Sequence, residues 1–459
     1  MSPDKLANLL KDELSAIACS TKPADLQHFG QDWTRFYAPK PSVIFYPDNA
    51  EQVQQIMRVA SANNQSVVPS GGRTGYSAGA VATNGEWVVS LVRLNHIGAL
   101  NAIDRTVQVG AGVITEQLQN FAQDQGLYYP VDFASAGSSH IGGNIATNAG
   151  GIKVLRYGLT RDYVMGLTVV TAEGQLLHLN KGLVKNATGP DLRHLMIGSE
   201  GILGIIVAAD IKLIEPPPPQ TVMLLSLANL AAVMATFKKA QQQLKLSSFE
   251  FFSDRALHRV MSHRTLNNPF EEIHPFYILL EFDEDENAAM AVFEQGLEEG
   301  DITDGIIAQS IEQADQLWQY REGISESIAE FTPYKNDISV KISKVTDFMQ
   351  RLDGILAEHY PAFETIWFGH IGDGNLHLNI LKPDKLTVDD FKQQCETVNT
   401  HVYGLIQELT GSISAEHGVG LLKKPYLHYS KSTTEISLLK AIKHSFDPKG
   451  ILNPGKVID

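Results

Sequence analysis

The sequence predicts an α+β protein with two main domains, and three observations lead to this fold class. Its 459 residues are 43% hydrophobic and 19% charged, which is enough apolar material for more than one core. Short strand-like runs alternate with amphipathic helical segments along the chain. Glu215 is followed by the four prolines Pro216–Pro219. Because proline continues neither a helix nor a strand ladder, this run predicts a stiff connector between domains.

The first domain is expected to begin with an amphipathic helix formed by Met1–Ser20, whose acidic residues argue against a signal or transit peptide. A strand at Ser42–Tyr46 precedes a helix capped by Asp48, with Val53, Ile56, Met57 and Ala60 on its apolar face. Further strands are predicted at Ser66–Pro69, Trp87–Leu91, Thr106–Val109, Leu167–Thr171 (with a hairpin turn at Glu173-Gly174) and Ile202–Ile214.

The second domain is expected to be a mostly antiparallel sheet with helices on one side. A helix over Leu317–Ala329 would place Arg321 and Ser325 on one face, because they are four residues apart. The last helix is predicted to end near Phe446. The other predicted elements are strands at Thr221–Leu227, Ser248–Phe252, Phe276–Phe282 and Gly305–Ser310 and a helix at Leu230–Leu244.

Charge and cysteine content exclude several classes of protein. With 37 basic and 52 acidic residues the net charge is −15, which disfavours nucleic acid as a partner. The only two cysteines, Cys19 and Cys395, are too few for a disulfide scaffold or a Cys-rich metal site and suit a reducing compartment. No window reaches the 18 or so apolar residues of a membrane helix. The chain is therefore expected to be soluble and cytoplasmic, with no membrane span.

Two segments are rich in glycine and small polar residues: PSGGRTGYSAGA (69–80) and PVDFASAGSSHIGGNIATNAGG (130–151). Glycine lets the backbone approach a ligand, and its N–H groups can then surround phosphate oxygens. Neither segment has the Rossmann or the Walker spacing. Each alone could be a surface loop, but together they favour a diphosphate-containing cofactor.

A third pattern concerns histidines. Ile366–Ile380 reads IWFGHIGDGNLHLNI, a strand–turn–strand that brings His370 near His377 and places Asn379 on the face of His377. Glu416 and His417 follow later, between small residues. Two imidazoles and a carboxylate would hold zinc with one position open, and iron, manganese or cobalt accept similar ligands. Spacing alone leaves open that these histidines are structural.

The chain resembles the FAD-dependent D-2-hydroxyacid dehydrogenases of the vanillyl-alcohol oxidase type. The resemblance covers nearly the whole chain and is carried by the two glycine-rich segments and by RYGLTRDYV, GSEGILGIIVAADIKL, WQYREGISESI, YKNDISV, WFGHIGDGNLHLNI, GSISAEHGVG and FDPKGILNPGK. It implies a two-subdomain FAD-binding domain in residues 1–215 and an α+β substrate-binding cap on an antiparallel sheet in 216–411. Residues 412–459 would form a C-terminal segment that closes the active site and packs on the FAD domain.

The resemblance also assigns residues. The diphosphate is expected on Ser70–Gly75, and the first loop has no histidine to attach FAD covalently, so FAD should dissociate.

His370, His377 and Glu416 match metal ligands, with Zn²⁺ the expected ion. Arg321, Ser325, Lys335 and Asn379 match substrate contacts, although an arginine or a loop lysine is often only solvated; Ser325 replaces a threonine and keeps the hydroxyl. His417 matches a substrate-contacting position and is expected to be the base. The expected FAD contacts are Pro69, Ser70, Gly71, Gly72, Arg73, Thr74, Gly75, Ser135, Gly137, Ser138, Gly142, Gly143, Asn144, Thr147, Asn148, Gly150, Gly201, Ile206 and Asn453.

The implied activity is metal-assisted hydride transfer from a 2-hydroxy dicarboxylate to the flavin, with D-2-hydroxyglutarate as the expected substrate and 2-oxoglutarate as the product. D-lactate and D-malate are alternatives, as is a role as the flavoprotein subunit of a larger complex. A zinc hydrolase would not need the glycine segments. Electron-transfer flavoprotein is the expected soluble acceptor, and a homodimer is a further expectation.

Overall fold

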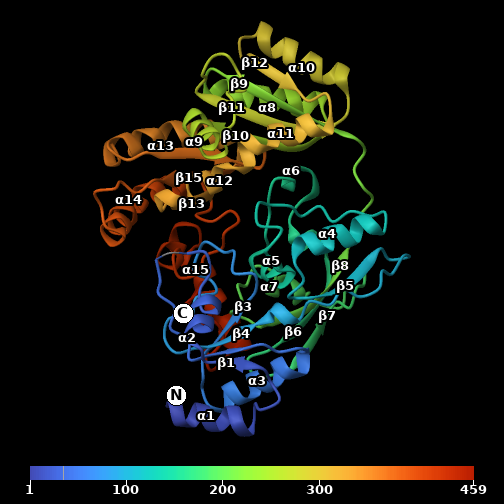
Figure 1. Cartoon of the computed structure of the whole chain (residues 1–459), viewed down its shortest axis with the longest axis vertical. Coiled ribbons are helices and arrows are strands. Elements are labelled where there is room, and N and C mark those ends of the chain that lie inside the picture. Colours follow the sequence, from blue (N-terminus) through green and yellow to red (C-terminus); the bar gives the residue numbers. More distant parts are fainter. Residues whose placement is uncertain (35) are drawn as a thin grey trace. The chain divides into compact units, whose positions relative to one another are not determined.

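The computed structural model describes residues 1–34 and 36–459, and these form two compact units (Figure 1). Unit 1 consists of Met1–Gly150, Leu159–Pro216 and Glu416–Asp459. Unit 2 consists of Gly151–Gly158 and Pro217–Ala415. The chain passes from one unit to the other between Pro216 and Pro217, within the predicted proline connector.

The first sheet of unit 1 has the strand order β1-β2-β4-β3 in the described part of the chain. Its strands are β1 (Cys19–Ser20), β2 (Val43–Phe45), β3 (Val67–Ser70) and β4 (Trp87–Ser90), of which β2 and β3 both run parallel to β4. Helix α3 (Ala50–Ala62) connects β2 to β3, and its N-cap is Asn49 rather than the predicted Asp48. β3 leads directly into the first glycine-rich segment.

The second sheet of unit 1 is antiparallel, with the order β5-β8-β6-β7 among the described residues. Its strands are β5 (Thr106–Gly110), β6 (Val164–Val170), β7 (Leu176–Leu179) and β8 (Ile205–Lys212). The β6–β7 hairpin turns at Glu173-Gly174 as predicted. The helices of this unit include α1 (Pro3–Asp12), shorter than expected, α2 (Pro23–Phe29), α4 (Thr115–Asp124), α5 (Ile141–Thr147), α7 (Arg193–Met196) and α15 (Thr433–Phe446).

The C-terminal segment is built into unit 1 beside β3. Val67 N–H donates to the Ile451 carbonyl at 2.8 Å, and Asn453 N–H donates to the Val67 carbonyl at 2.7 Å. The buried Asp447 carboxylate accepts hydrogen bonds from Lys443 Nζ and from the Leu452 N–H. Leu452 therefore belongs to the same apolar core as Phe45 and Trp87.

Unit 2 is built on a larger antiparallel sheet, whose order in the described chain is β12-β9-β11-β10-β14-β15-β13. The strands are β9 (Gln220–Leu227), β10 (Leu246–Ser253), β11 (Phe276–Asp283), β12 (Ile302–Ile307), β13 (Tyr334–Ser339), β14 (Thr365–Gly369) and β15 (Asn375–Ile380). The helices include α6 (Val154–Tyr157), α8 (Leu230–Gln243), α9 (Asp254–Arg264), α10 (Glu286–Glu298), α11 (Ile311–Glu322), α12 (Ile324–Ser327), α13 (Val345–His359) and α14 (Val388–Glu408).

Helices cover both faces of this sheet, so the prediction of helices on one side is wrong. On one face, Leu224 belongs to a buried cluster with Leu257 of α9 and Trp318 of α11. On the other face, the Phe237 ring of α8 lies 4.9 Å from the ring of Phe249. The reason is visible in β9, where consecutive apolar residues rather than alternating ones are buried.

The predicted helix over Leu317–Ala329 is also wrong, because it breaks at Gly323 between α11 and α12. A Cβ at Gly323 would lie 2.8 Å from Arg264 Nε and 3.0 Å from the Gln319 carbonyl, so glycine lets these groups pack closely there. Arg321 and Ser325 consequently lie on two different short helices rather than on one face.

Residues Gly151–Gly158 belong to unit 2, although the sequence-based division places them in the first domain. The reason is electrostatic. Lys153 Nζ contacts Glu281 at 2.5 Å and Arg156 is paired with Asp283, and all four side chains are largely buried. Among the described helices, none combines the length and apolarity that a membrane crossing requires.

Candidate active site

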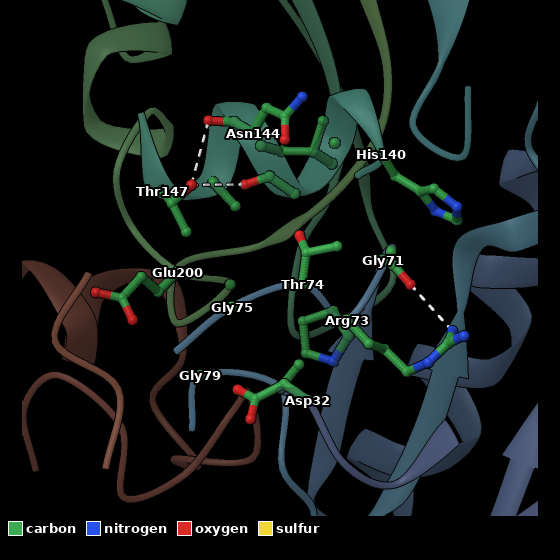
Figure 2. A pocket seen from close by; sticks show the side chains of 18 of the residues that line it. Asp32, Gly71, Arg73, Thr74, Gly75, Gly79, His140, Asn144, Thr147 and Glu200 are labelled. Carbon is green, nitrogen blue, oxygen red and sulfur yellow. Dashed lines mark hydrogen bonds between the residues drawn. The ribbon is translucent and has the colours of Figure 1, made fainter. Parts of the chain in front are cut away.

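Unit 1 contains a pocket at the glycine-rich segments (Figure 2). Among the described residues its lining consists of Asp32, Pro69, Gly71, Gly72, Arg73, Thr74, Gly75, Ser77, Gly79, Ala80, His140, Gly142, Gly143, Asn144, Ala146, Thr147, Glu200, Gly201, Gly204, Ile205, Ile206 and His417.

The glycines of this pocket serve two different purposes. A Cβ at Gly72 would lie 2.3 Å from the Ser138 carbonyl oxygen, so glycine there allows the two segments to pack closely. A Cβ at Gly143 would meet nothing within 4 Å, although the helical backbone of α5 would accept one. Gly143 therefore leaves space in the pocket itself, which is what a closely held ligand requires.

The turn of the first glycine segment is held by Arg73. Its backbone has φ +60°, a left-handed conformation that is uncommon outside glycine. Its guanidinium donates to the Gly71 carbonyl at 3.2 Å (Figure 2) and lies 4.6 Å from the centre of the Phe29 ring. Arg73 thus places a partly buried positive charge at the loop where the diphosphate is expected.

The structure brings twelve of the expected FAD contacts onto the lining of this one pocket: Pro69, Gly71, Gly72, Arg73, Thr74, Gly75, Gly142, Gly143, Asn144, Thr147, Gly201 and Ile206. Seven others are not among its lining residues: Ser70, Ser135, Gly137, Ser138, Asn148, Gly150 and Asn453. Asn453 instead holds the wall of the pocket, because its amide donates to the carbonyls of Gly79 at 2.8 Å and Glu200 at 2.7 Å.

Sequence reasoning missed three ionisable residues of this pocket: Asp32, His140 and Glu200 (Figure 2). Burial raises the pKa of the Asp32 and Glu200 carboxyl groups, although hydrogen bonds oppose the rise in both cases. Burial, helped by the nearby Arg73 charge, lowers the pKa of His140 to about 4, so this imidazole is neutral at pH 7. A charged residue within GSEGILG is the signal that could have identified Glu200.

Glu200 fixes the segment that carries His417. Its carboxylate accepts hydrogen bonds from the N–H groups of Val419 at 2.6 Å and Gly420 at 2.9 Å. The His417 carbonyl accepts a hydrogen bond from Ser77 Oγ at 2.8 Å, and the centre of the His417 ring lies 4.8 Å from that of the Tyr76 ring. His417 is thereby held on the lining of the pocket. Glu416, the residue before it, follows directly after the last residue of unit 2, Ala415.

Unit 2 holds the histidine hairpin. β14 and β15 are joined by a short turn in which Gly374 has φ +85°, and a Cβ there would lie 2.3 Å from the Val340 carbonyl. The turn brings the rings of His370 and His377 to 5.4 Å between their centres, nearly perpendicular to each other. Both imidazoles are more than 90% buried.

A buried carboxylate lies behind each of these imidazoles. Nδ1 of His370 is 2.9 Å from both carboxylate oxygens of Glu250. Nδ1 of His377 is 3.7 Å from Asp337, its cross-strand neighbour in β13. Histidines that ligate metals commonly direct one ring nitrogen at a carboxylate in this way, so that Nε2 faces the ion. The donor set therefore fits a divalent cation.

Cationic side chains lie on the neighbouring elements of the same unit. Nη2 of Arg321 is 2.7 Å from Glu250, its guanidinium lies over the ring of Phe368, and its buried Nε has no hydrogen-bond partner in the described chain. Burial lowers the pKa of Lys335 to about 8. Lys335 in β13 lies opposite the buried Asn379 in β15. Ser325 is half-buried in α12.

The residues of this unit that sequence reasoning missed are acidic: Glu250, Asp337 and Asp373. Burial raises the pKa of Asp373, in the hairpin turn, to about 6, and the Glu250 and Asp337 charges act in the same direction. Three carboxyl groups around two imidazoles make the surroundings favourable to a cation. Glu250 interrupts the otherwise uncharged run SSFEFFS, and this was the available signal.

Comparison with known protein families identifies the class. Residues 41–180 match the FAD binding domain family, and residues 216–457 match the C-terminal domain of the FAD linked oxidases. The chain is therefore an FAD-dependent oxidoreductase.

Curated relatives then specify the family. D-2-hydroxyglutarate dehydrogenase of Xanthomonas citri is 53% identical over 98% of this chain and 96% of its own. The enzyme of the same name from Stutzerimonas stutzeri is 52% identical over 100% of this chain and 99% of its own. The mitochondrial one of Danio rerio is 36% identical over 95% and 82%. The chain belongs to the D-2-hydroxyglutarate dehydrogenase family of FAD-dependent dehydrogenases.

Solved structures support the fold. p-Cresol methylhydroxylase has a TM-score of 0.78 at 13% identity, covering 100% of this chain and 98% of its own. 4-Ethylphenol oxidase from Gulosibacter chungangensis has a TM-score of 0.76 at 16% identity over the same shares. The predicted α+β fold of the vanillyl-alcohol oxidase type is confirmed.

Proposed function

We propose that this protein oxidises D-2-hydroxyglutarate to 2-oxoglutarate, with FAD in the pocket of unit 1 and the substrate at the histidine hairpin of unit 2. The names of the relatives support the substrate. The observation that carries the proposal is the pair of cationic side chains, the buried Arg321 and the half-buried Lys335, in the unit that also holds His370 and His377. A dicarboxylate needs two such cations, whereas D-lactate needs one.

The chain's own residues bind and orient the substrate. Arg321, with its buried Nε donor, would bind one carboxylate, and Lys335 the other. Asn379 and Ser325 would complete these contacts and present one enantiomer. FAD, held by the pocket of unit 1, would supply the acceptor for the two electrons and the α-carbon hydrogen that leave the substrate as a hydride. The C2 hydroxyl loses its proton to His417, which lines the FAD pocket, and the C–O bond becomes C=O.

We further propose that His370, His377 and Glu416 hold a divalent cation, Zn²⁺ in the first instance, with iron, manganese and cobalt as alternatives. The carboxylates behind both rings support this assignment. When bound, such a cation lowers the pKa of a coordinated hydroxyl.

The substrate is tested by mixing FAD-loaded protein anaerobically with D-2-hydroxyglutarate, D-malate and D-lactate and recording flavin bleaching. We expect bleaching at the lowest concentration with D-2-hydroxyglutarate, and little with its L-enantiomer. Bleaching by D-lactate at equal or lower concentration would contradict the dicarboxylate assignment.

The cation is tested by elemental analysis of His370→Ala. We expect this variant to keep its FAD spectrum and to lose its metal and most of its turnover. His444→Ala, which changes an exposed histidine of α15, is the matched control and should keep both. Full metal content in His370→Ala would overturn the assignment.

Electron-transfer flavoprotein as the acceptor, a homodimer and a cytoplasmic location are the remaining proposals, and they rest on the sequence and its family. Turnover of the purified chain with an artificial dye would exclude the alternative that it functions only as a subunit of a larger complex. Absence of turnover with bleachable FAD present would favour that alternative.

A further inference from the structure

We propose that Glu250 is a positioning residue that links the metal-binding histidine to the substrate-binding arginine. The inference rests on the proposed function, which places a cation at His370 and a substrate carboxylate at Arg321. Glu250 lies in the middle of β10 and is 1% exposed. Nδ1 of His370 is 2.9 Å from its two oxygens, and Nη2 of Arg321 is 2.7 Å from Oε2.

The position of Glu250 is unusual for a carboxylate. Its strand neighbours Phe249 and Phe251 are fully buried, and it lies directly opposite Leu279 in β11. A carboxylate surrounded by apolar side chains is strongly desolvated and is retained only when charged or polar partners satisfy it. An apolar residue would suit the sheet better, so the carboxylate is there for its two partners.

Each contact has a chemical consequence. Glu250 accepts a hydrogen bond from the Nδ1–H of His370. This bond fixes the neutral tautomer in which Nε2 carries the lone pair, as a metal ligand requires. The Nη2 of Arg321 forms an ion pair with Oε2 of Glu250 at 2.7 Å, which holds the guanidinium in place and leaves its buried Nε for a carboxylate ligand. One side chain thus orients both groups.

The second imidazole provides an internal comparison. His377 also faces a carboxylate, but Nδ1 is 3.7 Å from Asp337, and that carboxylate accepts a hydrogen bond from the amide of Asn375 at 2.9 Å. The Glu250 side, which includes Arg321, is the one expected to couple the affinity for metal to the affinity for substrate.

The test is Glu250→Gln, which replaces one carboxylate oxygen by an amide NH2 group. This donor would then face either the Nδ1–H of His370 or the guanidinium of Arg321, which are also donors. The metal is first removed from the FAD-loaded protein with a chelator, and the Kd for Zn²⁺ is then measured by equilibrium dialysis. This measurement needs no turnover. We expect the Kd to rise 10- to 100-fold, and the Kd for D-2-hydroxyglutarate to rise as well. Arg321→Met should change the Kd for Zn²⁺ in the wild-type background and not in the Glu250→Gln background, because the coupling passes through Glu250.

The matched control is Glu281→Gln. Glu281 is a buried carboxylate on the adjacent strand that is paired with Lys153. Its loss should leave the Kd for Zn²⁺ within twofold of wild type. A rise equal to that in Glu250→Gln would mean that any buried carboxylate of the sheet has this effect and would overturn the inference.

The outcomes separate this inference from the proposed function. Wild-type Zn²⁺ affinity in Glu250→Gln, together with loss of metal in His370→Ala, overturns the role of Glu250 and leaves the metal site standing. Wild-type Zn²⁺ affinity in His370→Ala overturns both. If Glu250→Gln does not fold, Glu250→Asp keeps the charge and shortens its reach, and we expect at least a tenfold rise in Kd; an unchanged Kd would again overturn the inference.

Discussion

At the scale of single residues, burial gives ordinary side chains unusual properties. Arg321 and Lys335 would be ordinary on a surface, but in unit 2 Arg321 is buried, Lys335 is half-buried, and burial lowers the pKa of Lys335. A buried cation gains much from an anionic ligand, because the ligand replaces the hydration that folding removed. Burial therefore makes these two residues strong candidates for carboxylate binding.

Lys335 leads to a prediction about pH. Since burial lowers its pKa from about 10.5 to about 8, the folded chain releases this proton before the unfolded chain does. Between these pH values the unfolded state binds more protons, so the contribution of Lys335 to the free energy of unfolding rises with pH. The affinity for the substrate falls as the pH rises, because the neutral amine of Lys335 cannot attract a carboxylate.

We accordingly expect KM for D-2-hydroxyglutarate to rise above about pH 8 and measure it from pH 7 to 10. In Lys335→Arg the guanidinium stays protonated throughout this range. The rise should therefore be absent from that variant, whatever its affinity at pH 7. The same rise in both proteins would assign it to another group.

The second prediction at this scale concerns His417. Replacing it with asparagine keeps a polar side chain but removes the base, so kcat should fall by roughly 10²- to 10⁴-fold while FAD content stays at the wild-type level. Absorbance gives the FAD content and dye reduction gives kcat. A wild-type kcat that does not vary with pH would argue against a titrating base.

At the scale of elements, two glycines of the FAD pocket should respond differently to alanine. In Gly143→Ala the new Cβ has no tertiary contact within 4 Å among the described residues, and alanine suits a helical position better than glycine. The FAD-free protein should therefore be up to about 1 kcal/mol more stable, while FAD affinity falls. Gly72→Ala forces the loop away from Ser138 and should lower both the stability, by about 1–3 kcal/mol, and the FAD affinity.

Thermal unfolding without FAD and titration with FAD measure these two effects separately. Equal losses of stability in both variants would mean that Gly143 is needed for packing rather than for the space it leaves.

The elements show which parts of the fold could be predicted. Strands with distinct apolar runs, such as β9 and β11, and the helix ending at Phe446 are confirmed. The helices on both faces of the unit 2 sheet were missed, although the unbroken apolar runs indicated two buried faces. Gly323, where the helix breaks, packs against Arg264, which is distant in sequence, and no local pattern reports such a contact.

The site shows the same limit. Residues in short motifs, such as His370 and His377, could be proposed from spacing because the hairpin that unites them is local. Glu250 and Asp337 come from other strands and reach the histidines only through sheet pairing. Glu200 accepts a hydrogen bond from the N–H of Val419, which lies more than 200 residues away in the sequence. Contacts of this kind are set by tertiary structure alone.

At the scale of the whole molecule, each unit has its own apolar core. We therefore expect calorimetry to resolve two unfolding transitions, of which FAD shifts only the one that belongs to unit 1. At 100 times its Kd, FAD adds about 2.7 kcal/mol, or roughly 5–10 °C in Tm. A single transition that moves as one would show that the chain unfolds as one cooperative block.

The pairing of Ile451–Asn453 with Val67 has a consequence for biosynthesis. Asn453 anchors Gly79 and Glu200 in the pocket wall, yet it is translated nearly 400 residues after β3. A nascent chain in which residue 453 has not yet been made can form most of the FAD pocket, but it lacks the hydrogen bonds that Asn453 donates to the pocket wall. We therefore expect a chain shortened before Asn453 to bind FAD more weakly than the full chain.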